Sequence, residues 1–144
     1  MMDMETVFTF ANAFVLAGWL ALLLAPRAPK LADRIASVVI PLLLAIAYLV
    51  LAPVFFTFTE GGFDSLANVM ILFDNPRAVM AGWLHYLAFD LFIGAWQVRQ
   101  AREHNIRHLV IIPSLILTLL LGPVGLLAFF MTRFVYTKRL FNKV

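Results

Sequence analysis

Residues 78–98 read AVMAGWLHYLAFDLFIGAWQV, an apolar run in which Asp90 is the one charged residue. A transmembrane helix needs roughly 20 predominantly apolar residues, so this run is long enough to cross a bilayer. None of the apolar runs in the chain alternates polar and apolar residues as a barrel strand does. The other three contain no Asp, Glu, Lys or Arg, over 7–25, 35–57 and 109–132. The sequence therefore predicts an all-α polytopic membrane protein, a bundle of four transmembrane helices that forms one domain over 1–144.

The composition of the 144-residue chain agrees with this prediction. Hydrophobic residues make up 63% of the chain and charged residues 13%, with a mean hydropathy of +0.94. Soluble domains are about 45–50% apolar and about 25% charged, so a soluble, disordered or nucleic-acid-binding chain is excluded. The absence of cysteine removes disulfides, thiolate nucleophiles and cysteine metal sites. The residues before the first span include Asp3 and Glu5 and do not form the basic region of a signal peptide. This favours the inner (cytoplasmic) membrane of a bacterium, with a chain that has already been processed as the alternative.

The connection between the second and third runs carries helix signals of its own. Asp64 or Ser65 could cap a short helix whose apolar residues, Leu66, Val69, Met70 and Phe73, recur at helical spacing. We expect this segment to lie on the bilayer surface, with an irregular loop as the alternative. Asn75 before Pro76 is typical of a cap followed by proline at the first helical position.

Basic residues divide almost evenly between the two sides of a four-span chain. One side would carry Arg27, Lys30, Arg34, Arg99, Arg102 and Arg107, and the other Arg77, Arg133, Lys138, Arg139 and Lys143. The positive-inside rule gives more weight to short early loops, which favours both termini outside. Residues 133–144, predicted to form a basic interfacial tail, would instead favour the cytoplasmic side, where anionic lipid attracts them.

Asp90 is the leading candidate for a functional residue. It lies close to the midpoint of its span, where an aspartate costs at least about 2.5–3.5 kcal/mol on insertion and is a functional candidate by default. The alternative is a neutral side chain that bonds to a neighbouring helix, for example to Asn12. At about 100° per residue, Tyr86 lies one turn from Asp90 on the same face, whereas His85 lies on another face and cannot form a dyad with Asp90 on this helix. Both could still border one cavity if this span is central in the bundle.

Aromatic and amide side chains accompany these polar groups along the third span. Trp83 and Gln97 share the stripe of Asp90, and Phe89 and Trp96 share the face of His85. A mostly apolar site with few polar anchors is typical of a pocket for a small molecule. The same aromatic residues are also what lipid-facing helices use.

The fourth run carries small residues, Ser114, Thr118, Gly122, Gly125 and Thr132, within one helical face. Such residues let helices approach closely in lipid, within the bundle or in a homodimer, and the first span has a comparable strip at Ala13, Ala17, Ala21 and Ala25. Pro123 frees the carbonyl of Leu119, so we expect a kink near Gly122. His104 and His108 are four residues apart, but no other ligand pair supports a metal site, and we predict none.

Two stretches resemble a known family. They are ANAFVLAGWLALLLAPR (11–27) and WLHYLAFDLFIGAW (83–96), and GPVGLL (122–127) follows them. The chain resembles the plant neoxanthin-synthase family and its bacterial relatives, which are abscisic-acid-deficient-four-like membrane proteins classed as a domain of unknown function. The plant members are associated with conversion of violaxanthin to neoxanthin, an isomerisation that opens an epoxide and forms an allene. That reaction needs an acid and a base but no redox cofactor.

The resemblance implies a cofactor-independent isomerase that acts on a carotenoid or isoprenoid. Asp90 would serve as the acid, and His85 or Tyr86 as the base or a polar anchor. The ligand site would be lined by Asn12, Trp83, Phe89, Trp96 and Gln97. Two alternatives stay open: a non-catalytic protein that binds lipid or pigment or assembles with a complex, and a proton or small-solute pathway. The expected partners are membrane lipid, a carotenoid or isoprenoid ligand and a second copy of the chain, with no nucleic acid.

Overall fold

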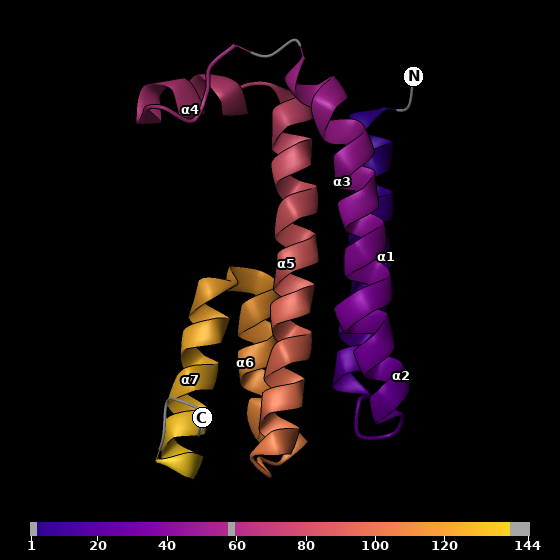
Figure 1. Cartoon of the computed structure of the whole chain (residues 1–144), viewed down its shortest axis with the longest axis vertical. Helices are drawn as coiled ribbons and strands as arrows, with labels where there is room; N and C mark the ends of the chain where they lie inside the picture. Colours follow the sequence, from indigo (N-terminus) through magenta and orange to yellow (C-terminus); the bar gives the residue numbers. More distant parts are fainter. Residues whose placement is uncertain (1–2, 58–59, 139–144) are drawn as a thin grey trace.

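The computed structural model describes residues 3–57 and 60–138, and the secondary structure within them is helical (Figure 1). The elements in chain order are α1 (Met4–Leu23), α2 (Pro29–Arg34), the π-helical turn η1 (Ile35–Val39), α3 (Ile40–Phe56), α4 (Leu66–Phe73), α5 (Pro76–Glu103), α6 (His108–Leu121) and α7 (Pro123–Thr137). The predicted all-α class is confirmed.

Three helical rods are long and apolar enough to cross a membrane. They are α1, the unbroken succession of α2, η1 and α3 over Pro29–Pro53, and α5. They correspond to the predicted spans 7–25, 35–57 and 78–98. α5 is the central one, because it packs against α1, α3 and α6. Its 28 residues extend over about 42 Å, more than the hydrocarbon core of about 30 Å.

Glycines allow α1 and α5 to pack closely. A methyl group at Gly94 would lie 2.8 Å from the ring of Trp19, and one at Gly18 would meet the side chain of Leu91. Since lipid tails are as apolar as the helices, close van der Waals packing of this kind drives helix association in a membrane. The buried face of α1 is formed by Val7, Ala11, Val15, Gly18, Trp19 and Leu22.

The structure corrects the prediction of a fourth spanning helix over 109–132. The segment forms two antiparallel helices, α6 and α7, which lie side by side as a hairpin on one end of α5 (Figure 1). α6 has 14 residues and α7 has 15. At 1.5 Å per residue they extend over about 21 and 22 Å, too short to cross the core. The hairpin therefore returns to the end at which it starts.

The reversal has a local cause at Gly122. This residue has a φ of 28° and a ψ of −87°, a conformation that favours glycine because it has no Cβ. Pro123 then begins α7 at the position where its missing N–H costs nothing. A side chain at Gly125 would overlap the backbone nitrogen of Thr118. The glycines and proline that predicted a kink thus produce a full turn.

The connection between the second and third spans matches its prediction. α4 is a helix that lies crosswise at one end of α5 and projects away from α1 and α3 (Figure 1). The Ser65 hydroxyl accepts a hydrogen bond from the Asn68 backbone N–H at 3.2 Å. Asn75 caps α5, with its side chain accepting from the Arg77 N–H at 2.9 Å and Pro76 at the first helical position. The predicted interfacial segment is therefore a capped helix.

The hairpin also changes the end of the chain. α7 continues to Thr137, and Arg133 within it is only 3% exposed. The start of the predicted basic tail, 133–144, is therefore helical, and 139–144 lie outside the described residues. The described chain begins at one end of the molecule and finishes at the other (Figure 1). Four spans would place both termini on the same side of the membrane. With three spans and the hairpin, the two ends of the described chain lie on opposite sides.

Candidate functional site

Asp90 lies at the middle of α5, level with the tip of the α6–α7 hairpin. A methyl group at Gly122 would lie 3.0 and 3.1 Å from the carboxyl atoms Oδ1 and Oδ2, so the carboxyl packs directly on the turn. Gly122 immediately precedes α7, whose N-terminal end carries partial positive charge. Asp90 thus lies beside the first residues of α7.

Tyr86 joins Asp90 at this tip. Its hydroxyl donates to the Leu119 carbonyl at 3.3 Å and lies within hydrogen-bonding reach of the Asp90 carboxyl. The Leu119 carbonyl is the one that Pro123 leaves without its helical partner, because proline has no N–H. The sequence predicted that this carbonyl would be free, and the structure shows that the tyrosine satisfies it.

One carboxyl oxygen of Asp90 remains unsatisfied. Oδ2 is buried and has no hydrogen-bond partner among the described residues. Most buried polar atoms in proteins are paired, so an exception calls for an explanation. A hydrogen-bond donor on a ligand would satisfy this oxygen.

Asn12 does not reach Asp90. Its Oδ1 accepts a hydrogen bond from Trp83 Nε1 at 3.2 Å, and its Nδ2 donates to the Phe8 carbonyl at 2.8 Å. Trp83 in turn lies against Tyr86, with ring centroids 5.3 Å apart. The predicted contact between Asn12 and Asp90 is therefore wrong. Asn12 instead begins a row of contacting side chains, Asn12, Trp83 and Tyr86, that leads towards Asp90.

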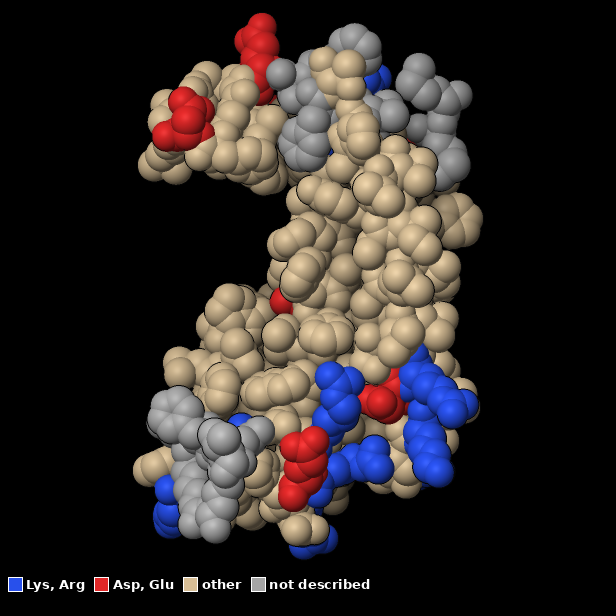
Figure 2. Space-filling model, viewed as in Figure 1, with Lys and Arg blue, Asp and Glu red and all other residues tan. Residues whose placement is uncertain are grey.

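A hollow in the molecular surface lies beside this row of residues. Figure 2 shows it between α4 and the hairpin, with acidic atoms at its lower corner. A cavity of about 350 Å³ lies between the starts of α1 and α5, and its lining consists of Met4, Glu5, Phe8, Asp74, Pro76, Val79, Met80 and Trp83. Trp83 therefore borders both the cavity and the row that ends at Asp90. The lining is mostly apolar, and Glu5 and Asp74 are its acidic residues.

Comparison with protein families identifies the chain. A family model described as ABA DEFICIENT 4-like, or ABA4-like, matches residues 6–129. The chain belongs to the ABA4-like family. The resemblance carried by 11–27 and 83–96 is thereby confirmed. Comparisons with curated proteins and with solved structures gave no match.

The matched region of this ABA4-like protein contains the three spans and the hairpin as far as Phe129. Asp90, Tyr86 and Gly122 all lie inside it. Family membership and three apolar helices together make this a membrane-embedded protein of the ABA4-like family.

His85 and Phe89 lie on a different face of α5. His85 is exposed, and its ring centroid lies 4.5 Å from that of Phe89 and 6.4 Å from that of Tyr48 on α3. Phe89 lines a groove of about 400 Å³ between α3 and α5. The structure therefore keeps His85 apart from Asp90, as the helical geometry of the sequence predicted.

Trp96 and Gln97 connect the hairpin to α5. Gln97 is fully buried and donates to the Thr118 hydroxyl at 2.8 Å. Trp96 packs on α7, with its ring centroid 5.4 Å from that of Phe129 and 5.6 Å from that of Phe130. Both side chains therefore hold the hairpin against α5, Gln97 through α6 and Trp96 through α7. Their predicted role in ligand binding stays a prediction.

Sequence reasoning singled out Leu119 and Gly122 for a kink but did not place them beside Asp90 and Tyr86, and it missed the burial of Arg133 in the hairpin. Arg133 is buried and donates to the Gln100 side chain at 3.0 Å. The hairpin could have been predicted from the sequence, because Gly122 and Pro123 divide 109–132 into two segments that are each too short to cross the hydrocarbon core.

His104 and His108 do not share a helical face. His104 follows α5, His108 begins α6, and Asn105 between them has a φ of 56°. His108 Nε2 lies 3.2 Å from the Leu23 carbonyl. Burial lowers the pKa of His108 below its ordinary value of 6.5, although hydrogen bonds to the carbonyls of Leu23 and Leu22 oppose the shift. Among the described residues, no group of three His, Asp or Glu residues could hold a metal ion.

Proposed function

We propose that this ABA4-like protein binds an isoprenoid-like molecule, such as a carotenoid, and isomerises it by acid–base catalysis at Asp90. The observation that carries this proposal is the meeting of the Asp90 carboxyl and the Tyr86 hydroxyl at the hairpin tip. This pair of proton-bearing groups lies in the middle of the longest span and beside an apolar hollow. A water-soluble substrate would not reach it easily.

The reaction transfers protons and needs no change of oxidation state. The protonated Asp90 carboxyl donates its proton to an oxygen of the ligand, for example an epoxide, and the carbon–oxygen bond breaks. The resulting carboxylate is stabilised by the N-terminal end of α7. It then takes a proton from a carbon next to the reacting centre, which restores the acid and completes an isomerisation. Asp90 thus acts in turn as acid and base, so His85 is not needed.

Tyr86 positions the acid in this scheme. Its hydroxyl is anchored on the Leu119 carbonyl and can point its remaining lone pair at the carboxyl or at the ligand. A phenol bound in this way orients the Asp90 carboxyl but does not itself donate or accept the proton that is transferred. We therefore expect Tyr86→Phe to lower turnover by about 10-fold to 100-fold, less than the loss of Asp90.

The length of α5 decides how such a ligand could lie. Asp90 is about 21 Å along the helix from Pro76, at 1.5 Å per residue. A carotenoid is about as long as the hydrocarbon core, roughly 30 Å. One end group would therefore lie at Asp90, and the rest would run along Tyr86 and Trp83 towards α4 and beyond. An isoprenoid with its reactive group at one end fits this arrangement best.

The test combines extraction with substitution. The protein and its Asp90→Asn, Tyr86→Phe and His85→Gln variants are purified from membranes that contain isoprenoids, extracted with organic solvent and analysed by mass spectrometry. We expect the unconverted ligand to accumulate in Asp90→Asn, while His85→Gln, which lies on the other face, resembles the unsubstituted protein.

Two results would contradict the proposal. Bulk phospholipid alone in every sample would exclude an isoprenoid ligand. The same unconverted isoprenoid in the unsubstituted protein and in Asp90→Asn would leave binding but remove catalysis. That second outcome corresponds to the non-catalytic alternative.

A further inference from the structure

The charged residues of the described chain are unevenly divided between the two ends of the molecule, although the acidic residues Asp33 and Glu103 share one end with most of the basic residues. Apart from Arg77, its lysines and arginines lie at the end where the hairpin begins and finishes: Arg27, Lys30, Arg34, Arg99, Arg102, Arg107, Arg133 and Lys138. We call these eight residues the basic end. Figure 2 shows blue side chains gathered there.

The opposite end is acidic. It carries Asp3 and Glu5 before and within the start of α1, Glu60 and Asp64 before α4, and Asp74 before α5. A four-span chain would have divided the basic residues almost evenly. The hairpin removes that balance, because it brings Arg133 and Lys138 back to the end that already carries the basic residues between α1 and α3 and between α5 and α6.

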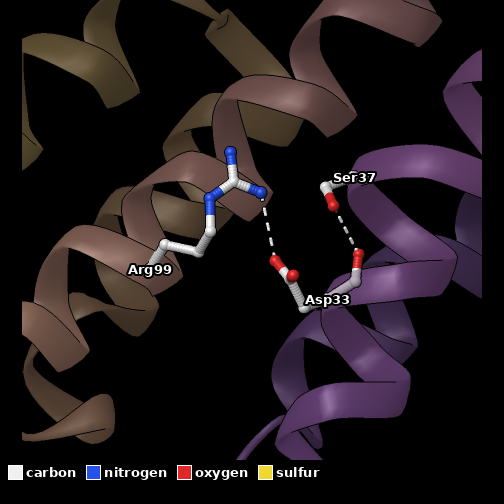
Figure 3. A network of polar contacts seen from close by, with 3 residues as sticks. All are labelled: Asp33, Ser37 and Arg99. Atoms are coloured by element: carbon white, nitrogen blue, oxygen red, sulfur yellow. Dashed lines mark hydrogen bonds and ion pairs between the residues drawn. The ribbon is translucent and has the colours of Figure 1, made fainter.

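Part of the basic end joins the second span to the third. Arg99 of α5 donates to Asp33 of α2 at 3.0 Å, and the Ser37 hydroxyl donates to the Asp33 carbonyl at 2.6 Å (Figure 3). Arg99 also lies over the ring of Phe92, with 5.7 Å between its Cζ and the ring centroid. These contacts connect the second span to the third.

The remaining basic side chains face outward. Arg27, Lys30, Arg34, Arg102, Arg107 and Lys138 are all exposed. They surround the ends of all three spans and of the hairpin, and the ends of membrane spans lie close to the lipid headgroups. Anionic headgroups on the cytoplasmic leaflet attract such clusters, and lysine and arginine in short loops hold their side of the protein in the cytoplasm.

We propose that the basic end docks on an anionic cytoplasmic leaflet and so determines the orientation of the protein. The C-terminal end and the mouth of the hairpin lie on the cytoplasmic side, and the N-terminal end with α4 lies on the other. The hollow above Asp90 then occupies the outer half of the bilayer. A ligand enters it from the outer leaflet; this last step rests on the proposed function, whereas the orientation does not.

The test uses the absence of cysteine from the chain, since any label then reports an introduced residue. Single variants Ala28→Cys, Ala67→Cys and Lys138→Cys, all at exposed positions, are produced in a bacterial host. Intact cells are treated with a membrane-impermeant maleimide, and permeabilised cells give the total labelling. We expect Ala67→Cys to be labelled in intact cells and the other two only after permeabilisation.

Different labelling patterns would contradict the orientation and the single basic end. Labelling of Ala28→Cys and Lys138→Cys in intact cells would overturn the orientation. Labelling of Lys138→Cys but not Ala28→Cys would place the two on opposite sides, and would overturn the single basic end. Neither result needs a ligand, so failure here is distinct from failure of the proposed function.

A second variant tests the role of charge. All six exposed basic residues are changed to Gln in the Ala67→Cys background, with Arg77→Gln as the matched control at the other end. We expect the labelled fraction of Ala67→Cys in intact cells to fall by about half or more in the first variant and to stay unchanged in the second. A charge-neutralised protein that inserts and keeps full labelling would overturn the docking role.

Discussion

The second span and the hairpin are made from similar sequence and fold differently. Both 35–57 and 109–132 are apolar runs without charged residues, and both contain two prolines. α3 continues through Pro53, and α6 continues through Pro113. Only at Pro123 does the chain reverse. Proline alone is therefore tolerated in these helices.

The difference lies in the glycines around Pro123. Gly122 supplies a backbone conformation with positive φ, and Gly125 lets α7 pack on the backbone of Thr118. Neither Pro53 nor Pro113 has a glycine beside it. A turn in the middle of a membrane needs a special conformation and close contact at once, because the backbone there has no water to bond. Substitutions at the turn can test this comparison.

The largest effect is expected at Gly125. In Gly125→Leu the side chain would overlap the backbone of Thr118, so α6 and α7 could not stay together. We expect a loss of about 3 kcal/mol or more, or failure to fold, because overpacking against backbone cannot be relieved by rotation of a side chain. Unfolding in detergent measures it. Gly82→Ala, which meets only the ring of Phe73, is the control; equal stability of both variants would contradict the packing argument.

Gly122→Ala should have a smaller effect on stability and a direct effect on the site. The positive φ costs an alanine about 1–2 kcal/mol. Its methyl group would lie 3.0 Å from the nearest carboxyl oxygen of Asp90 and would displace it. We expect both stability and ligand conversion to fall, whereas Pro53→Ala should lower neither. A stable Gly122→Ala variant with normal conversion would show that Asp90 does not depend on the turn.

Thr118→Val tests how the hairpin is held to α5. The change removes the acceptor for the buried Gln97 amide. A buried polar group left without its partner costs about 1–3 kcal/mol. Thr132→Val is the matched control, since the Thr132 hydroxyl bonds only within its own helix, to the Ala128 carbonyl at 2.9 Å. If the two variants unfold at the same temperature, the bond between Gln97 and Thr118 does not hold the hairpin.

The smallest effect concerns pH at the basic end. Burial lowers the pKa of His108 in the folded protein, so the unfolded chain binds the proton more readily. Stability should therefore be unaffected above the ordinary pKa of 6.5 and should decrease as the pH falls below it. Thermal unfolding at pH 8, 6.5 and 5 measures the change. His108→Gln should flatten this dependence, and a variant with the same acid sensitivity would assign it to another group.

Residues whose role depends on the local chain were predicted well. The three spans, the cap at Asn75 and Pro76 and the interfacial helix follow from apolar length and cap chemistry, which neighbouring residues determine. The separation of His85 from Asp90 follows from helical geometry. The free carbonyl of Leu119 follows from the missing N–H of Pro123.

Residues whose role depends on distant contacts were not predicted. In the expected packing strip of the first span, Ala13 and Ala17 are exposed, whereas Ala21 is half-buried and Ala25 is buried. Gly18 and Trp19, outside that strip, are buried against α5. Asn12 bonds to Trp83 and not to Asp90. Both depend on how α1 is rotated against its neighbours, which the sequence of α1 alone does not specify.

The sequence by itself determined that this chain is helical, embedded in a membrane and provided with one acid inside a span, because insertion depends on apolar length and charge along the chain. Only the tertiary structure decided that the last apolar run turns back at Gly122, places its tip on Asp90 and collects the basic residues at one end. The physical reason is that the turn is stabilised by contacts between residues on different helices, such as Gly125 with Thr118 and Gln97 with Thr118.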